Sequence, residues 1–135
     1  MTTQTEFKIT GIGQIAIPVH DLERAVGFYR HKLGLSHLFS VPNLAFFDCG
    51  GVRLMLSVPE KAEFDHPSSI IYFNVPDIQT AYDTLSAQGV SFEDTPHLIA
   101  QLENHDVWMV FFRDSENNLL SLMSEVARSE TIMSD

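Results

Sequence analysis

The sequence contains one pattern of elements twice, and the second copy begins 56 residues after the first. The copies open with QIAIPVHDLERAVGFYRHKLGL (14–35) and IIYFNVPDIQTAYDTLSAQGV (70–90), and each later reaches two adjoining strands, at residues 45–57 and 110–124. Two copies are too few for a solenoid, whose stacked repeats usually number at least three. The repeat therefore predicts an α+β fold of two tandem βαβββ modules around a pseudo-twofold axis, whose mixed and antiparallel strands form a concave cleft.

A helix is indicated after the first strand of each copy. Asp21 can accept hydrogen bonds from the free amides of a first helical turn, and Gly34 supplies a left-handed stop. Asp77 and Gly89 have the same places in the second copy. Apolar residues recur at helical spacing between each cap and stop, namely Leu22, Ala25, Val26, Tyr29 and Leu33, and then Ile78, Ala81, Tyr82 and Leu85. The matching caps, apolar stripes and stops support a duplication.

A chain of 135 residues is of the right size for one domain that buries roughly two-thirds of its unfolded surface. We expect the first module at about residues 9–60 and the second at about 66–126. The polar ends, residues 1–6 and 127–135, are expected to fray as flexible tails.

Two stretches carry proline, histidine and acidic residues and lack strand alternation. Residues 59–68 are expected to link the two modules, and residues 93–106 to form a loop that borders the cleft. The sequences CGG (49–51) and DSENN (114–118) are typical of turns in hairpins.

The chain has 18 acidic and 8 basic residues and a net charge of −10. This balance argues against binding to nucleic acid, which needs cations to displace phosphate counterions. No apolar run approaches the ~20 residues of a membrane span, and the N-terminus lacks a secretion signal. Cys49 is the single cysteine and has no basic neighbour in sequence, so a structural thiol in a cytoplasmic protein is expected.

Strand alternation assigns side chains to the two faces of each sheet. The helices must cover the more uniformly apolar faces, so the other faces line the concave side. Trp108 and Phe112 are expected to add aromatic surface there, although alternation leaves open which of Phe46 and Phe47, and which of Phe111 and Phe112, face inward. The remaining side chains expected to bind a ligand are Gln14, Arg53, Met55, Ile70, Tyr72, Asn74, Ser121 and Met123.

VHDLERAVGFYRHKLGL (19–35) and FFRDSENNLLSLMSE (111–125) resemble motifs of the vicinal oxygen chelate superfamily. That superfamily includes glyoxalase I, extradiol dioxygenases, methylmalonyl-CoA epimerase, and the bleomycin- and fosfomycin-resistance proteins. The resemblance covers about residues 9–126. It implies the paired-module fold and a homodimer, but the same fold supports several activities.

In the metal-dependent members, four equivalent positions on the concave face supply His, Gln or Glu ligands. The resemblance implies that these positions are Gln14, Met55, Ile70 and Ser121 in this sequence. A hard divalent cation needs carboxylate, imidazole or carbonyl donors, and of these four only Gln14 offers one. A shift of one residue along each strand brings in no better donors. We therefore expect no metal at these positions, and no other cofactor.

A different set of donors remains an alternative. His97, Glu103 and His105 lie close together in sequence and could converge with Gln14 or Glu125, although their spacing matches no established zinc pattern. His97 or His105 could also act as a metal-free acid or base.

The sequence leaves three functional hypotheses. The favoured one is a metal-independent protein that binds an apolar or aromatic small molecule in the cleft, similar to the bleomycin-resistance branch. The second is an enzyme of the lactoylglutathione lyase, epimerase or dioxygenase type, with a non-standard metal site or a loop histidine. The third is a scaffold that serves only for dimerisation. Metal content and metal-dependent binding distinguish the first two hypotheses.

Overall fold

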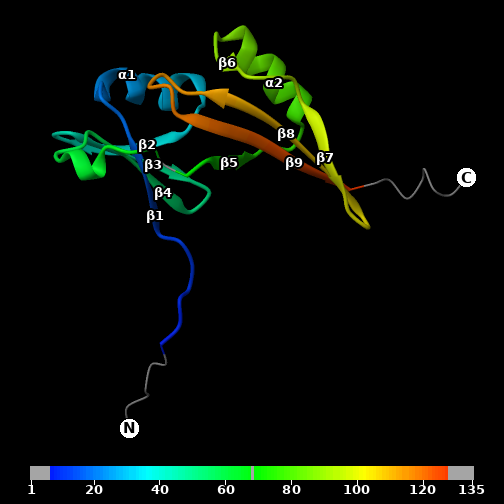
Figure 1. Ribbon diagram of the computed structural model, residues 1–135, viewed down its shortest axis with the longest axis horizontal. Coiled ribbons are helices and arrows are strands. Elements are labelled where there is room, and N and C mark those ends of the chain that lie inside the picture. Colours follow the sequence, from blue (N-terminus) through cyan, green and yellow to red (C-terminus); the bar gives the residue numbers. More distant parts are fainter. Residues whose placement is uncertain (1–6, 68, 128–135) are drawn as a thin grey trace, which may run out of the picture.

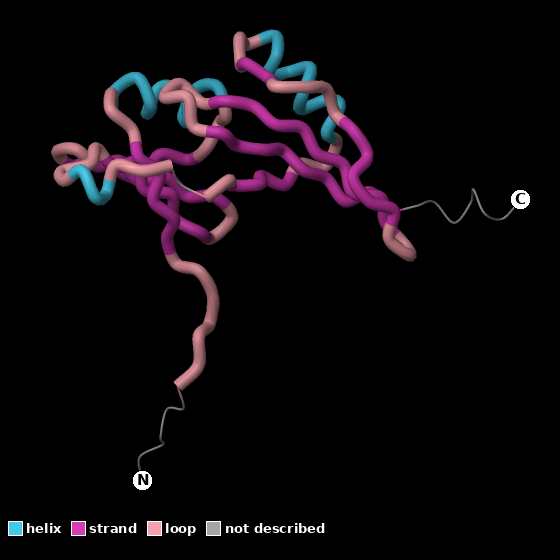
Figure 2. The backbone as a smooth tube through the Cα atoms, viewed as in Figure 1, coloured by secondary structure: helices cyan, strands magenta, loops and turns pink. Residues whose placement is uncertain are grey.

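The computed structural model describes residues 7–67 and 69–127. Apart from residue 127, the ends that were expected to fray are outside the described residues. Two β-sheets lie side by side, and both α-helices cover the same side of them (Figure 1). The stretch before the first strand leads away from the sheets as a loop (Figure 2). No helix within the described ranges is both long enough and apolar enough to cross a membrane.

The first sheet has the strand order β1-β4-β3-β2. Strand β1 pairs with β4 in parallel, and the other pairs are antiparallel. The elements of this half are β1 (Gln14–Pro18), α1 (Leu22–Gly27), a π-helical turn η1 (Phe28–Lys32), β2 (Ser36–Val41), β3 (Leu44–Cys49) and β4 (Val52–Ser57).

The second sheet repeats this layout with the order β5-β9-β8-β6, and β7 also pairs with β8. Strand β5 is parallel to β9, just as β1 is parallel to β4. The elements are a 3₁₀ turn η2 (Ala62–Phe64) in the connection, then β5 (Ile71–Asn74), α2 (Ile78–Ala87), β6 (Ser91–Phe92), β7 (His97–Gln101), β8 (His105–Arg113) and β9 (Leu119–Ala127). The α+β fold with duplicated βαβββ topology is confirmed.

The helix signals act as the sequence predicts. The Asp21 carboxylate accepts from the amide of Arg24 at 3.0 Å, and Asp77 accepts from the amides that follow it in α2. Gly34 and Gly89 have φ of +75° and +90°, a region that glycine adopts without steric cost. The first helix differs in one respect, because it widens into the π-helical turn η1 instead of remaining α-helical to its end.

The expected loop at residues 93–106 is wrong over part of its length, because it contains β7 and the start of β8. Strand β7 pairs with β8 alone, with a register shift between Leu98 and Ala100. The apolar residues of this edge strand, Leu98, Ile99 and Ala100, are consecutive and do not alternate with polar ones, so the alternation test missed it.

The two halves share one hydrophobic core under the helices. Ile17 and Phe47 of the first half and Val110 and Phe112 of the second are fully buried in the same cluster. The core therefore occupies the helix-covered faces of the sheets. The opposite faces, called here the helix-free faces, are left for a site.

Candidate functional site

The helix-free face of the first sheet carries the residues that strand alternation assigned to it. Directly opposed residues of neighbouring strands share a face, and Gln14 opposes Arg53 while Ala16 opposes Met55. The alternate residue Leu54 is buried in the core.

The amide of Gln14 is engaged by its neighbours. Its Oε1 accepts from Nε of Arg53 at 2.9 Å, and its Nε2 donates to Sδ of Met55 at 3.6 Å. The Arg53 guanidinium lies 5.5 Å from the ring centroid of Phe46, which stacks on Phe39 with centroids 4.5 Å apart. Phe46 thus lies on the helix-free face and Phe47 in the core, which resolves the choice that the sequence left open.

A cavity of about 560 Å³ lies on this face, called here the Met55 cavity. The connection between the halves covers it, through Phe64 and His66, and Asn43 stands at its side. These residues were not predicted as site residues, because nothing in the composition of a linker says that it folds back over a sheet. The floor is formed by Ala16, Pro18, Met55 and Ser57.

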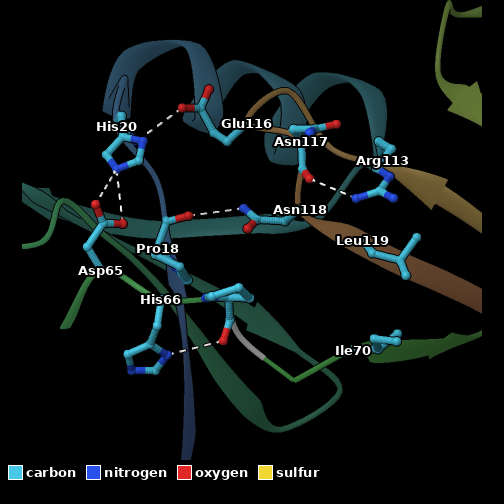
Figure 3. A pocket seen from close by; sticks show the side chains of 11 residues that line it. Pro18, His20, Asp65, His66, Ile70, Arg113, Glu116, Asn117, Asn118 and Leu119 are labelled. Atoms are coloured by element: carbon cyan, nitrogen blue, oxygen red, sulfur yellow. Dashed lines mark hydrogen bonds and ion pairs between the residues drawn. The ribbon is translucent and has the colours of Figure 1, made fainter. Parts of the chain in front are cut away.

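Figure 3 shows the lining of a second cavity, of about 410 Å³. It adjoins the first, because the two share Pro18, His66 and Pro67. It lies where the β1–α1 loop, the connection and the β8–β9 turn meet. Nε2 of His20 lies 3.1 Å from the Asp65 carboxylate, and this pair joins the connection to the β1–α1 loop. Ile70 lines this cavity, so two of the predicted residues, Met55 and Ile70, line adjoining hollows.

On the second sheet, one row across the helix-free face consists of Tyr72, Ser121 and Phe111. The rings of Tyr72 and Phe111 meet edge to face, with centroids 6.0 Å apart, on either side of the serine. Ser121 has 0% exposure, and its Oγ lies 3.0 Å from the carbonyl oxygen of Val110. Its hydroxyl is therefore used inside the sheet, while Tyr72 is 40% exposed.

The next row of this face carries Asn74, Met123, Met109 and His97. Two methionines flanked by an amide and an imidazole give a surface that is apolar and adaptable, with polar groups at its ends. Asn74, Met123 and Tyr72 thus lie on the face to which the sequence assigned them.

Phe112 and Trp108 do not lie on the helix-free face. Phe112 is fully buried in the core, and Trp108 packs against that core from the same side of β8. The neighbouring residue Phe111 faces the other way and supplies the ring on the helix-free face. The predicted site residue Phe112 is thus corrected to Phe111. Consecutive residues of a strand point to opposite faces, so an assignment that is wrong by one residue puts the wrong phenylalanine on the face.

The two candidate histidines are separated along the sheet. His97 opposes Met109, four residues along β8 from His105, which corresponds to roughly 13 Å. Nδ1 of His97 lies 3.0 Å from the Thr95 carbonyl oxygen and 3.6 Å from the Asp94 carboxylate. Within residues 7–67 and 69–127, no group of three or more His, Cys, Asp or Glu side chains is placed to hold a metal ion.

The four positions implied by the resemblance do not fit a divalent metal ion. Gln14 is bonded to its neighbours, Met55 offers a thioether and Ile70 a hydrocarbon, and the Ser121 hydroxyl is buried in the sheet. A hard cation would need several oxygen or imidazole donors in their place.

Comparison with known proteins identifies the family. The model of the Glyoxalase/Bleomycin resistance protein/Dioxygenase superfamily matches residues 11–122. Because this match spans most of the chain and the fold agrees, the protein belongs to that superfamily.

Three individual proteins illustrate the range of its relatives. The uncharacterized protein YraH of Bacillus subtilis (strain 168) is 29% identical over 123 residues, 81% of this chain and 94% of YraH. A superfamily member from Sphaerobacter thermophilus DSM 20745 has a TM-score of 0.72 and 26% identity, over 87% of this chain and 98% of that one. A lactoylglutathione lyase from Agrobacterium tumefaciens, at 24% identity and a TM-score of 0.66 over 86% and 94% of the chains, supports the fold alone.

Proposed function

We propose that this protein binds an apolar or aromatic small molecule in the Met55 cavity without a metal ion. The observation that carries the proposal is the state of the four positions at which metal-dependent relatives would place ligands. Gln14 is bonded to Arg53 and Met55, Ile70 is a hydrocarbon side chain that lines the adjoining cavity, and the Ser121 hydroxyl is buried in the sheet. A function that needs no Lewis acid agrees with these residues.

The lining of the cavity indicates the chemistry of the ligand. Met55, Leu44 and Phe64 provide apolar contact, and its volume of about 560 Å³ is within the usual range for small-molecule sites. The methionine side chain adapts to irregular ligands. Asn43, Ser57 and His66 can orient one polar group of a ligand.

The proposal is tested by binding of an uncharged naphthalene-type fluorescent probe, before and after exhaustive dialysis against a chelator. We expect the same affinity in both samples, because no metal takes part. Ala16→Trp places an indole in the cavity and should weaken binding at least about tenfold. The matched control is Ala62→Trp, on the exposed 3₁₀ turn outside the cavity lining, which should leave the affinity unchanged.

A different outcome would favour the enzyme hypothesis. His97 is held by Thr95 and Asp94 on the same face as Asn74, which is a reasonable position for an acid or base. Metal at one equivalent per chain, or turnover of a glyoxalase-type substrate that His97→Ala abolishes, would contradict metal-independent binding as the function. His105→Ala is the comparison variant. It removes an imidazole that lies about four residues along β8 from Met109, the residue that opposes His97.

We also propose that two copies of the chain associate through the helix-free face. Phe7, Ile9 and Ile12 precede β1 and are at least two-thirds exposed, and Phe39 and Tyr72 are exposed on the sheets. Large apolar side chains that are left exposed in this way often mark a contact with another molecule. Sedimentation at micromolar concentration should give a dimer, and Phe7→Asp with Ile9→Asp should shift it toward monomer. A monomer at every concentration would refute this assembly.

A further inference from the structure

A third cavity, of about 740 Å³, lies at the seam between the two halves. Its walls come from η1, the turn after β3, the unpaired edge of β5 and the inner side of α2. Most of its lining side chains belong to the helix-covered faces of the sheets. It is therefore distinct from the Met55 cavity. It is called here the seam cavity.

The seam cavity is lined mainly by hydrocarbon. The side chains that define its interior are Leu33, Leu35, Leu54, Ile71, Phe73 and Leu85, drawn from both halves of the chain. Each is partly or fully buried against the shared core, so the walls are fixed by packing. A cavity with such walls favours a flexible apolar chain, because each methylene that is removed from water on binding stabilises the complex.

One charged side chain, Lys32, is present among the lining residues, and no carboxylate accompanies it. In a chain of net charge −10 this is a local reversal of sign. The acidic residue nearest in sequence to the lining residue Cys49 is Asp48. It opposes Arg53 on the neighbouring strand, so the two side chains share the helix-free face. None of the ion pairs among the described residues uses Lys32.

The ammonium group of Lys32 is held at the rim of the cavity. It lies 5.9 Å from the ring centroid of Phe28 and 3.7 Å from the place where a Cβ on Gly89 would stand. Gly89 follows the C-terminal end of α2, whose partial negative charge attracts a cation. A side chain from the first half thus reaches the second half beside the apolar cavity.

We propose that the seam cavity binds a monoanionic amphiphile of the medium-chain carboxylate class. The carboxylate pairs with Lys32 at the rim, and the hydrocarbon tail lies between the leucines of the first half and Leu85 of α2. Thr84, also in the lining, can donate a hydrogen bond to the second carboxylate oxygen. This site shares only Ile15 with the lining of the Met55 cavity, so the two sites are otherwise made of different residues.

Cys49 provides the reporter, because it lines the seam cavity and is the single cysteine of the chain. Burial, together with the neighbouring Asp48, raises the pKa of its thiol, so alkylation is slow enough to follow. Dodecanoate, used below its micelle concentration, should slow alkylation of Cys49 by N-ethylmaleimide in a saturable manner. Dodecyltrimethylammonium, which has the same tail and the opposite charge, should not.

Two pairs of variants test the binding mode. Lys32→Gln should raise the dodecanoate Kd about fivefold, the effect of losing one exposed ion pair, while Lys61→Gln on the connection should not. Ala81→Phe fills the cavity from α2 and should abolish the protection of Cys49 by dodecanoate. Thr80→Phe changes the neighbouring residue, which is outside the lining, and should retain that protection.

The inference is overturned if the cationic amphiphile protects Cys49 as well as dodecanoate does, if Lys32→Gln binds dodecanoate as tightly as the parent chain, or if dodecanoate gives no protection. Ala16→Trp, which fills the Met55 cavity, should leave dodecanoate binding intact. Failure of one site is thereby distinguished from failure of the other.

Discussion

Replacing Asp114 by alanine should lower the free energy of unfolding by about 3–4 kcal/mol. The Asp114 carboxylate is buried in the β8–β9 turn and accepts four hydrogen bonds. Tyr29 of η1 donates its hydroxyl at 2.6 Å, and the backbone amides of Glu116 and Asn118 each donate at 2.8 Å. The fourth donor is the side-chain amide of Asn118, at 2.9 Å. Removing the carboxylate leaves these donors without their acceptor.

The same contact joins the two halves of the molecule. Tyr29 belongs to the first half and is fully buried, whereas Asp114 belongs to a turn of the second. Tyr29→Phe removes one donor of four and should therefore cost less, about 1–2 kcal/mol. In a double-mutant cycle, Tyr29→Phe and Asp114→Ala should be coupled by about 1 kcal/mol or more, because each removes the same hydrogen bond.

Chemical denaturation at neutral pH provides the measurement, and Tyr82→Phe provides the control. Tyr82 lies on α2 against Phe92, and its hydroxyl takes part in none of the hydrogen bonds described above, so its loss should change stability by less than about 0.5 kcal/mol. Equal effects of Tyr29→Phe and Tyr82→Phe would contradict the role assigned to the buried contact.

The contact also has a signature at alkaline pH. Burial, followed by the charge of Asp114, raises the pKa of Tyr29 well above its ordinary value. An unfolded tyrosine ionises near pH 10. The stabilisation that the protonated Tyr29 hydroxyl provides is therefore fully present below that pH and is lost as the pH rises above it. Tyr29→Phe should remove this alkaline loss of stability.

The fold could be predicted from the sequence because its signals are local and occur twice. Asp21 and Asp77 act as caps through hydrogen bonds to amides two or three residues ahead, and Gly34 and Gly89 require left-handed backbone. Such features depend on few neighbours. Recurrence of the same features in both halves then restricts the topology.

The site was less predictable because it depends on neighbours distant in sequence. Alternation places Tyr72 and Ser121 on one face, but it does not say that the rings of Tyr72 and Phe111 flank the serine and bury it. The cover that Phe64 and His66 provide over Met55 comes from a segment without strand periodicity. The sequence DSENN predicted a turn, yet gave no sign that Asp114 would meet Tyr29.

Glu116→Gln should destabilise the protein by about 1–2 kcal/mol at neutral pH, with the loss disappearing in acid. The Glu116 side chain is only 3% exposed, and its Oε2 accepts from Nε of Arg24 at 2.7 Å. Its Oε1 accepts from the backbone amide of His20 at 3.0 Å (Figure 3). The same oxygen accepts from the backbone amide of Asp21 at 3.1 Å, immediately before α1. This carboxylate therefore ties the β8–β9 turn to the start of the first helix.

The pH dependence follows from the pKa of Glu116. Burial alone would raise it, but the hydrogen bonds from Arg24 and from the amides of His20 and Asp21 outweigh burial and lower the pKa from 4.5 to about 2. A lowered pKa in the folded state stabilises the fold above pH 4.5, and this contribution is lost as the pH falls toward 2. Denaturation of the parent chain and of Glu116→Gln across this interval should give curves that converge at the acid end.

The matched control is Glu23→Gln, because Glu23 is an exposed acidic residue in the first turn of α1. Its stability should remain within about 0.5 kcal/mol of the parent throughout. A constant difference between the parent and Glu116→Gln from pH 7 to pH 2 would show that the carboxylate charge is not what stabilises this junction.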